Sequence, residues 1–391
     1  MAAKSTSLPL VVHLVYRLDF GGLETVLAEC VNGMPSDRYR HAVVCLTDYT
    51  EFAKKITQPG VQIHALHKPA GAAPGTHFKL WKLLRALRPA ILHTYNLAAI
   101  EYAFTAALAG VPIRIHAEHG RDLSDPEGKN RKHNLLRRFL IPFIDCFVPV
   151  SRDLKQWLAL VIGVPDTKNR LINNGVDTAR FVPRAPSTSA AQQAPPFIVG
   201  TVGRIQDIKN HAGLVRAFQR LREMLPAQRD SLRLQIIGDG PLMAALKTQV
   251  TAAGLDEAVW LAGSRTDIAA LMQDFSVFVL PSFAEGTPVT LLEAMATGLP
   301  VVASAVGGIP DVVADGVCGT LAAPTDIEAI ATALAAYCRE PALAAAHGAA
   351  ARKVVEDHYS IAAMLSHYTA LYDTLCQAKL RREPTLLPQK R

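Results

Sequence analysis

The chain has 391 residues, a length that suits two domains better than one hydrophobic core. Half of the residues are hydrophobic, which argues against a disordered protein, and no uninterrupted apolar stretch reaches the length of a membrane span. The formal net charge of +7 suits an anionic partner, such as a nucleotide diphosphate, an anionic lipid surface or a nucleic acid, although a solvated basic surface explains it as well.

The first half of the chain alternates short apolar runs with amphipathic stretches. The apolar runs predict strands at residues 10–16, 41–46, 61–66, 90–94, 113–117 and 146–150. The amphipathic stretches predict helices at residues 23–34, 78–87, 98–109, 135–141 and 154–161. Strands that alternate with helices of this length are typical of right-handed parallel βαβ units.

A composition change follows at residues 183–196, where Pro, Ala, Ser and Gln replace large apolar residues. We interpret this segment as a linker, although an extended surface loop within one domain would look similar. Beyond it, strands are predicted at residues 197–202, 232–237, 259–261, 277–280 and 300–303. Helices are predicted at residues 210–224, 242–253, 288–296, 326–338, 341–355 and 361–378.

The predicted organisation is an α/β protein with two doubly wound domains, residues 1–182 and residues 197–358. A last helix, residues 359–378, is expected to pack back on the N-terminal domain, and a basic tail, residues 379–391, is expected to fray. Two such domains place a ligand at the carboxyl ends of their strands.

The six cysteines form no CxxC pair and have no histidine at metal-ligand spacing. We expect reduced, mostly buried thiols in a cytoplasmic protein and no metal site.

The densest motif is PSFAEGTPVTLLEAMATG at residues 281–298, directly after a predicted buried strand. Thr287 suits a helix N-cap and Pro288 suits the first helical position. A helix that begins there directs free backbone amides and its positive end toward a phosphate or diphosphate.

Two carboxylates belong to this motif. Glu285 lies just outside the predicted helix, before Gly286, and Glu293 lies two turns inside it. Each carboxylate can accept hydrogen bonds from two vicinal hydroxyls, so one can bind a sugar and the other a ribose. A solvated helical glutamate is the ordinary alternative for Glu293, but Leu292 and Ala294 flank it in an apolar helix, where a charge needs partners.

With these residues the sequence resembles glycosyltransferase family 4. The resemblance rests on Glu285, seven intervening residues and Glu293, followed by AMATGLPVVAS, and it extends from Gly21 to about Tyr372. It implies a GT-B fold, in which two Rossmann-like domains face each other across a cleft, and a retaining transfer from a nucleotide-diphosphate sugar without a metal. Position 287 is Thr where many members carry a large apolar residue, so the resemblance does not specify the donor sugar.

Basic residues follow the first strand of the second half. That strand delivers Gly203 to the edge of the sheet, where Arg204 can bind a diphosphate with two parallel hydrogen bonds and Lys209 adds a point charge. Two surface basic residues would look the same in isolation. The resemblance implies that Arg204 and Lys209 stabilise the leaving nucleotide diphosphate.

Two further segments come from the first half. Gly21 and Gly22 follow the first strand and allow close approach of a ligand to a helix start, although a Gly-Gly pair is usually only a turn. The resemblance implies a histidine that contacts the transferred sugar at the end of the 113–117 strand. His119 matches best because Gly120 follows it, and His116 is the alternative, which strand alternation would turn into the core.

Two basic amphipathic stretches, residues 77–88 and residues 129–139, interleave Leu, Trp and Phe with Lys and Arg. Either could rest on an anionic membrane, or pack its apolar side on the sheet and expose its basic side to water. Their presence in the acceptor-side domain suggests peripheral association with the inner face of the cell membrane and a lipid-linked acceptor.

The sequence therefore predicts a retaining glycosyltransferase with Glu285, His119, Arg204 and Lys209 as catalytic residues. It transfers a hexose-type sugar to a glycan or lipid-linked acceptor, as bacterial members do in exopolysaccharide synthesis. The predicted donor-binding residues are Gly21, Gly22, Gly203, Arg204, Lys209, Glu285, Gly286, Thr287, Pro288 and Glu293. Two alternatives stay open: a nucleotide-sugar 2-epimerase of the same architecture, and a non-catalytic nucleic-acid-binding protein, for which the chain lacks an aromatic-interleaved basic motif.

Overall fold

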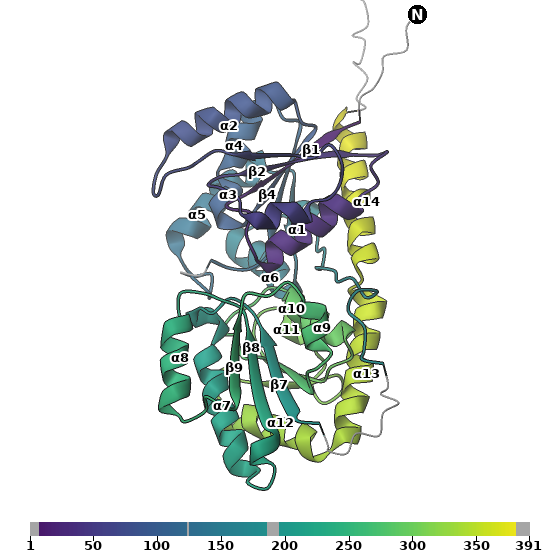
Figure 1. Cartoon of the computed structure of the whole chain (residues 1–391). Coiled ribbons are helices and arrows are strands. Elements are labelled where there is room, and N and C mark those ends of the chain that lie inside the picture. The colour runs from purple at the N-terminus through teal and green to yellow at the C-terminus, as the bar shows by residue number, and fades with distance from the viewer. Residues whose placement is uncertain (1–7, 123–124, 186–194, 381–391) are drawn as a thin grey trace, which may run out of the picture. The chain divides into compact units, whose positions relative to one another are not determined.

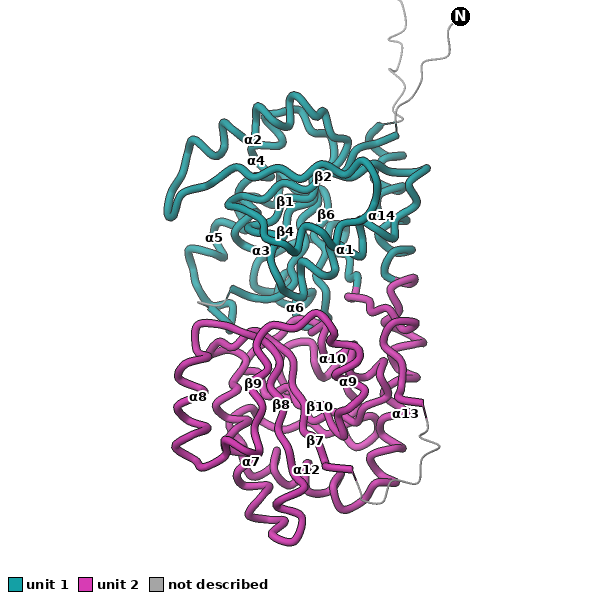
Figure 2. The backbone as a smooth tube through the Cα atoms, viewed as in Figure 1, with its two compact units in different colours: residues 1–172, 364–391 teal, residues 173–363 magenta. Residues whose placement is uncertain are grey.

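The computed structural model describes residues 8–122, 125–185 and 195–380, which form two compact units. Unit 1 contains residues up to 172 and those from 364 onward, and unit 2 contains residues 173–363 (Figures 1 and 2). The first unit thus ends ten residues before the predicted boundary at 182. Most of the predicted linker lies outside the described residues.

Unit 1 is built on a six-stranded parallel sheet in the order β3-β2-β1-β4-β5-β6. Its strands are β1 (Leu10–Val15), β2 (Arg40–Cys45), β3 (Gln62–Ala65), β4 (Ile91–Tyr95), β5 (Ile113–Glu118) and β6 (Cys146–Pro149). Its main helices are α1 (Gly22–Gly33), α2 (Pro74–Leu87), α3 (Asn96–Ile100), α4 (Tyr102–Leu108), α5 (Arg131–Leu140), α6 (Arg152–Trp157) and α14 (Ile361–Leu380). All six residues of β1 are buried, as expected for a central strand with helices on both faces.

Unit 2 repeats this design with the strand order β12-β11-β10-β7-β8-β9. Its strands are β7 (Phe197–Val202), β8 (Leu232–Ile237), β9 (Val259–Gly263), β10 (Val277–Leu280), β11 (Val301–Ser304) and β12 (Thr320–Ala322). Its helices are α7 (His211–Met224), α8 (Met243–Ala252), α9 (Ile268–Met272), α10 (Val289–Ala296), α11 (Ile309–Val312), α12 (Ile327–Arg339) and α13 (Pro341–His358). Both units are the doubly wound parallel sheets that the sequence predicts.

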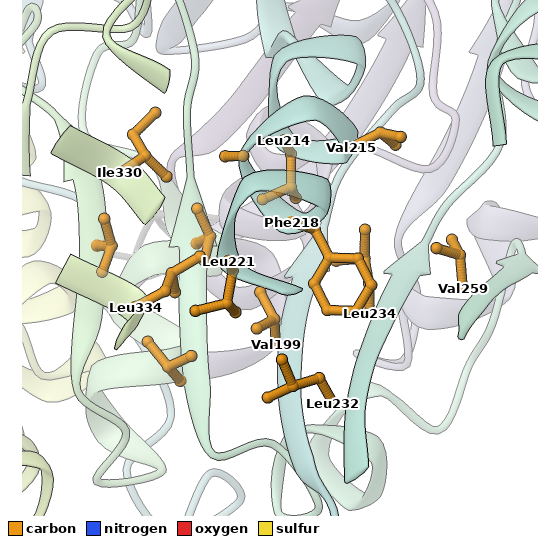
Figure 3. Packing of buried hydrophobic residues seen from close by; sticks show 14 of the residues in the cluster. Val199, Leu214, Val215, Phe218, Leu221, Leu232, Leu234, Val259, Ile330 and Leu334 are labelled. Carbon is orange, nitrogen blue, oxygen red and sulfur yellow. The ribbon is translucent and has the colours of Figure 1, made fainter. Parts of the chain in front are cut away.

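The core of unit 2 lies between its sheet and the helices that cover it. Phe218 of α7 packs over Leu234 of β8, while Leu334 of α12 fills the neighbouring space, and all three are fully buried (Figure 3). Burial of one such side chain stabilises the fold by about 1.5–3 kcal/mol. This packing holds the strands rigidly, so that the loops at their carboxyl ends start from fixed positions.

Several elements differ from the prediction, which also lacks the short helices α9 and α11. The helix expected at residues 98–109 is two helices, α3 and α4, and the helix expected at residues 154–161 is α6 followed by a π-helical turn, η3 (Leu158–Ile162). Sequence periodicity also misses β12, because a three-residue edge strand is too short to show a pattern. Within the described residues, no helix combines the length and the apolar character needed to cross a membrane.

A chain of buried polar side chains crosses the core of unit 1. His13 on β1 shares hydrogen bonds with Tyr95 (2.9 Å) and with His41 (3.0 Å). His93 on β4 shares one with Tyr372 of α14 (2.8 Å), which ties the last helix to the sheet. Burial lowers the pKa of His13 and His93 well below 6.5 and that of His41 to about 4, so the folded protein holds all three neutral.

We predict that unit 1 loses stability as the pH falls below about 6.5. In that pH range these histidines bind protons in the unfolded chain but stay neutral in the folded protein. Each of the three therefore lowers the free energy of unfolding by about 1.4 kcal/mol at pH 5.5. Urea unfolding at pH 7.5 and 5.5 measures the loss. A Trp260→Phe background leaves Trp81 and Trp157, both in unit 1, as the fluorescent reporters.

The control for this prediction compares two histidine variants. His41→Gln removes one buried titration and should reduce the pH-dependent loss by about 1.4 kcal/mol, whatever it costs at neutral pH. His367→Gln, at an exposed position, should leave the loss unchanged. Equal pH dependence in all three proteins would contradict the prediction.

Candidate functional site

The residues predicted to bind the donor lie at the switch point of the unit 2 sheet. Strands β7 and β10 are neighbours, but the chain continues from β7 to β8 on one side and from β10 to β11 on the other. Ligands of open α/β sheets bind at the carboxyl ends of such a strand pair. Gly203 and Arg204 directly follow β7, and residues 281–286 directly follow β10. The topology therefore brings two distant predicted segments to one edge.

A short ion pair joins the two segments. Lys209 Nζ lies 2.6 Å from Glu285 Oε1, and their side chains are 21% and 9% exposed. Beside the pair, the backbone amide of Phe283 donates to the carbonyl of Ile208 at 2.8 Å. Because partly buried charges lose hydration, each group depends on the other for compensation. The sequence predicted both residues for the site but not their contact.

Asn210 holds this pair of loops together, and the sequence analysis missed it. Its backbone is left-handed (φ 52°), its Oδ1 accepts from the amide of Gly213 (3.2 Å), and its Nδ2 donates to the carbonyls of Pro281 (3.1 Å) and Pro324 (2.8 Å). Asparagine suits both the left-handed conformation and the N-cap position. The available indication was an Asn directly before the amphipathic run of α7.

The start of α10 differs from the prediction by one residue. Pro288 is the N-cap, in an extended conformation (φ −72°, ψ 122°), and Val289 begins the helix, so Thr287 is not the cap. Thr287 is instead buried, and its carbonyl accepts from Asn174 Nδ2 at 2.7 Å. A residue before proline favours extended backbone, which keeps Thr287 out of the helix. The amide-bearing end of α10 still follows the Glu285 loop directly.

Two glycines after β11 fix the backbone of that loop. The amide of Gly308 donates to the carbonyl of Gly286 at 3.1 Å. Gly307 has a positive φ of 54°, and a Cβ there would lie 1.9 Å from the Glu285 carbonyl oxygen. Only glycine permits this approach. A Gly-Gly pair after a predicted strand, the same pattern as Gly21-Gly22, was the overlooked indication.

The other residues predicted to bind the donor lie near Lys209 or Glu285 in the sequence. Arg204 is exposed, and no carboxylate of the described residues forms an ion pair with it. Glu293 is half-buried in α10 between buried Leu292 and Ala294. Gly203 packs closely against Gly238. A Cβ on Gly238 would lie 2.0 Å from the carbonyl oxygen of Gly203. An exposed guanidinium, a shielded lysine and a helix start are together suited to bind a diphosphate.

In unit 1 the corresponding switch point lies between β1 and β4. Gly21 has an extended backbone (φ −170°) and caps α1, which begins at Gly22 without a side-chain cap. Both glycines are exposed. The start of a twelve-residue helix favours an anion, and the carboxylate of Glu24, in the first turn, lies close to Gly21.

The two candidate histidines have different surroundings. His116 is fully buried, with Nδ1 2.9 Å from Thr94 Oγ1 and Nε2 3.2 Å from Glu118 Oε1. Burial alone would raise the pKa of Glu118, but Arg137 and His116 lower it to about 2. The Arg137 guanidinium lies 2.6 Å from Glu118 and 4.9 Å from the Trp157 ring. His116 therefore belongs to a buried ionic cluster.

His119 lies just past the end of β5. Its backbone amide donates to Asn96 Oδ1 at 2.8 Å, and its ring lies 5.7 Å from that of Tyr95. Neither ring nitrogen has a hydrogen-bond partner among the described residues, and burial lowers the pKa of the ring to about 3. A neutral imidazole with unsatisfied nitrogens can donate to or accept from a hydroxyl. The sequence analysis did not predict that Asn96, which has a positive φ of 56°, accepts the hydrogen bond from the His119 amide.

Comparison with known proteins decides the family. Residues 20–180 match the family described as Glycosyltransferase Family 4, and residues 196–340 match the one described as Glycosyl transferases group 1. The lipopolysaccharide core biosynthesis mannosyltransferase LpcC of Rhizobium leguminosarum bv. viciae is 32% identical over 63% of this chain and 69% of its own. The chain belongs to glycosyltransferase family 4.

Further relatives of this glycosyltransferase agree. The Escherichia coli UDP-Gal:alpha-D-GlcNAc-diphosphoundecaprenol alpha-1,3-galactosyltransferase is 31% identical over 65% of this chain and 68% of its own. Among solved structures, Anabaena HepE in complex with UDP and glucose superposes with a TM-score of 0.80 at 21% identity, covering 94% of this chain and 100% of that one. The fold is thus the predicted GT-B class of two Rossmann-like domains.

We predict that Gly307→Ala lowers the transfer rate of the glycosyltransferase by at least about tenfold, because the new methyl group must displace the Glu285 carbonyl and small displacements of positioning groups are costly. Gly316→Ala is the matched control. Gly316 has a similar positive φ (70°) but open space around it, so both variants bear the backbone strain and only Gly307→Ala moves the site. Initial-rate assays of the two variants should differ, and equal rates would contradict the role of Gly307.

Proposed function

We propose that the protein is a retaining transferase that moves a hexose-type sugar from a nucleotide-diphosphate donor to a glycan or lipid-linked glycan acceptor. The process would be the synthesis of exopolysaccharide or another cell-surface polysaccharide, in the cytoplasm and in peripheral contact with an anionic membrane. The observation that carries the proposal is the Lys209–Glu285 pair at the switch point, beside the start of α10.

The donor is assigned to unit 2. Arg204 and Lys209 would neutralise the diphosphate, Glu285 would accept hydrogen bonds from the sugar hydroxyls, and Glu293 would do so for the ribose. HepE, which shares the fold, was crystallised with UDP and glucose, and the Escherichia coli relative is named for the donor UDP-Gal. These names support a nucleotide-sugar donor.

The acceptor is assigned to unit 1, at the edge formed by Gly21, Gly22 and His119. In the reaction the bond between the anomeric carbon and the diphosphate oxygen breaks, the acceptor oxygen bonds to the same carbon on the same face, and its proton leaves with the diphosphate. His119 would contact the transferred sugar with its unsatisfied ring nitrogens. The name of the Escherichia coli relative specifies a diphosphoundecaprenol-linked acceptor, which supports a lipid-linked substrate here. The two relatives named above are transferases and not epimerases, so they lend no support to the epimerase alternative.

Lys209→Met and Glu285→Gln should each lower the transfer rate by roughly 100- to 1,000-fold, the usual effect of removing one group that stabilises developing charge. Lys353→Met is the matched control, because it makes the same change at an exposed ion pair of unit 2. Initial rates with saturating donor measure the effect, and thermal unfolding checks that each variant folds. A Lys209→Met enzyme as active as Lys353→Met would remove the basis of the proposal.

The product should keep the anomeric configuration of the donor sugar. A thermal-shift panel of UDP, GDP and ADP sugars first selects the donor, and proton NMR of the product then assigns the anomer. The reactions contain EDTA, because the proposal assigns neutralisation of the diphosphate to side chains. An inverted anomer would refute retention, and dependence on an added divalent cation would refute the role given to Arg204 and Lys209.

A further inference from the structure

Three helices cover the same face of the unit 1 sheet. The strand order turns back between β3 and β4, so right-handed crossovers place α2, α4 and α5 on one face and α1 on the other (Figure 1). Both basic stretches singled out in the sequence, now α2 and α5, thus belong to one layer, with α4 packed against α2.

Helix α5 carries both polar and apolar side chains on its buried side and on its exposed side. Its buried residues are Asn134, Arg137 and Leu140, whereas Leu135 and Phe139 are 67% and 65% exposed. The buried Arg137 explains this orientation, since its bond to Glu118 and its stacking on Trp157 fix which side of the helix faces inward. Leu136 and Leu140 pack against the core of unit 1, so the alternative in which the apolar side packs inward applies to part of α5, while Leu135 and Phe139 stay exposed.

The exposed apolar side chains extend beyond α5 into its neighbours. The ring of Phe143, in the short turn η2 (Ile141–Phe143), lies 6.1 Å from that of Phe139 and 5.0 Å from that of exposed Phe104 on α4. Arg138 of α5 donates to the carbonyl of Val161 in η3 at 2.6 Å. We call this surface the α5 face; its exposed apolar members are Phe104, Leu108, Leu135, Phe139, Leu160 and Val161.

The exposed charged residues of α5 are all basic. Arg131, Lys132 and Arg138 are exposed on α5, and the four segments α4, α5, η2 and η3 contain no Asp or Glu. The helices on the opposite side of the sheet do carry carboxylates, such as Glu24 on α1. Carboxylates near these segments along the chain include Glu101, which lies beside His77, and Glu127, which pairs with Lys129. Exposed leucine and phenylalanine among the cations of α5 match the interface of an anionic bilayer, which accepts apolar groups and attracts basic ones.

We infer that the α5 face is a docking surface for an anionic lipid bilayer. This inference rests on the proposed function only for its purpose, which is to bring the enzyme to a lipid-linked acceptor. Arg137 gives the face a direct connection to the site, because its partner Glu118 immediately precedes His119 on the chain. A helix held on the membrane would thus be tied to the strand end that is assigned to the acceptor.

Vesicle flotation of the full-length protein tests the inference, with vesicles of phosphatidylcholine alone or with 30 mol% phosphatidylglycerol. The wild type should float only with the anionic vesicles. Arg131→Gln/Lys132→Gln should lower the partition coefficient roughly 25-fold, since each cation near an anionic surface contributes about fivefold. Leu135→Ser/Phe139→Ser should lower it at least about tenfold. Lys247→Gln/Val317→Ser, an exposed cation and an exposed aliphatic residue of unit 2, should bind as the wild type does.

Three results would overturn the inference: no wild-type flotation, equal flotation with neutral vesicles, or equal losses in the unit 2 control. The protein could instead bind no vesicles but form a dimer, measured by light scattering, that Leu135→Ser/Phe139→Ser dissociates. That result would assign the α5 face to a second copy of the chain. Calorimetric titration with nucleoside diphosphates separates this outcome from failure of the proposed function. Donor binding that persists in a protein without vesicle affinity refutes the docking surface alone.

Discussion

The ion pair between Lys209 and Glu285 joins two loops that lie 76 residues apart in the sequence and meet at one edge of the sheet. Its components are only partly exposed, so neither charge is stable there without the other or an equivalent ligand. Around it, Asn210 fixes one loop and Gly307 permits the close packing of the other. The arrangement of this edge of the unit 2 sheet depends on holding the two charged groups at fixed positions. The rigid packing of the core beneath them makes this possible.

Unit 1 uses buried polar groups in a different way. His13, His41 and His93 are held neutral in a hydrogen-bonded chain with two tyrosines, one of which comes from α14. This chain makes the last helix part of the unit that contains the first strands. The Glu118–Arg137 pair, in contrast, keeps its charges inside the protein. Because a buried charge must be compensated, that pair dictates which side of α5 is turned toward water.

Particular residues show how far the sequence alone could lead. The strands and most helices followed from periodicity, and the family followed from Glu285, Glu293 and the apolar sequence after them. The cap of α10 was predicted one residue too early, because Thr287 has a good capping side chain but precedes a proline. Asn210 and Gly307 had local indications, an Asn before a helix and a Gly-Gly pair after a strand, but their contacts with the Glu285 loop involve residues more than twenty positions away, which the local pattern does not specify.

The sequence by itself determined the doubly wound character of both units, the presence of a motif of acidic and basic residues and the family that carries it. These properties depend on local periodicity and on residue types at fixed spacing, which are written along the chain. Only the tertiary structure decided that Lys209 contacts Glu285, that His116 is buried while His119 follows the end of a strand, and that α5 exposes Leu135 and Phe139. Each of these features depends on the strand order and on the compensation of buried charges by segments that are distant in the sequence. These interactions form only when the chain has folded.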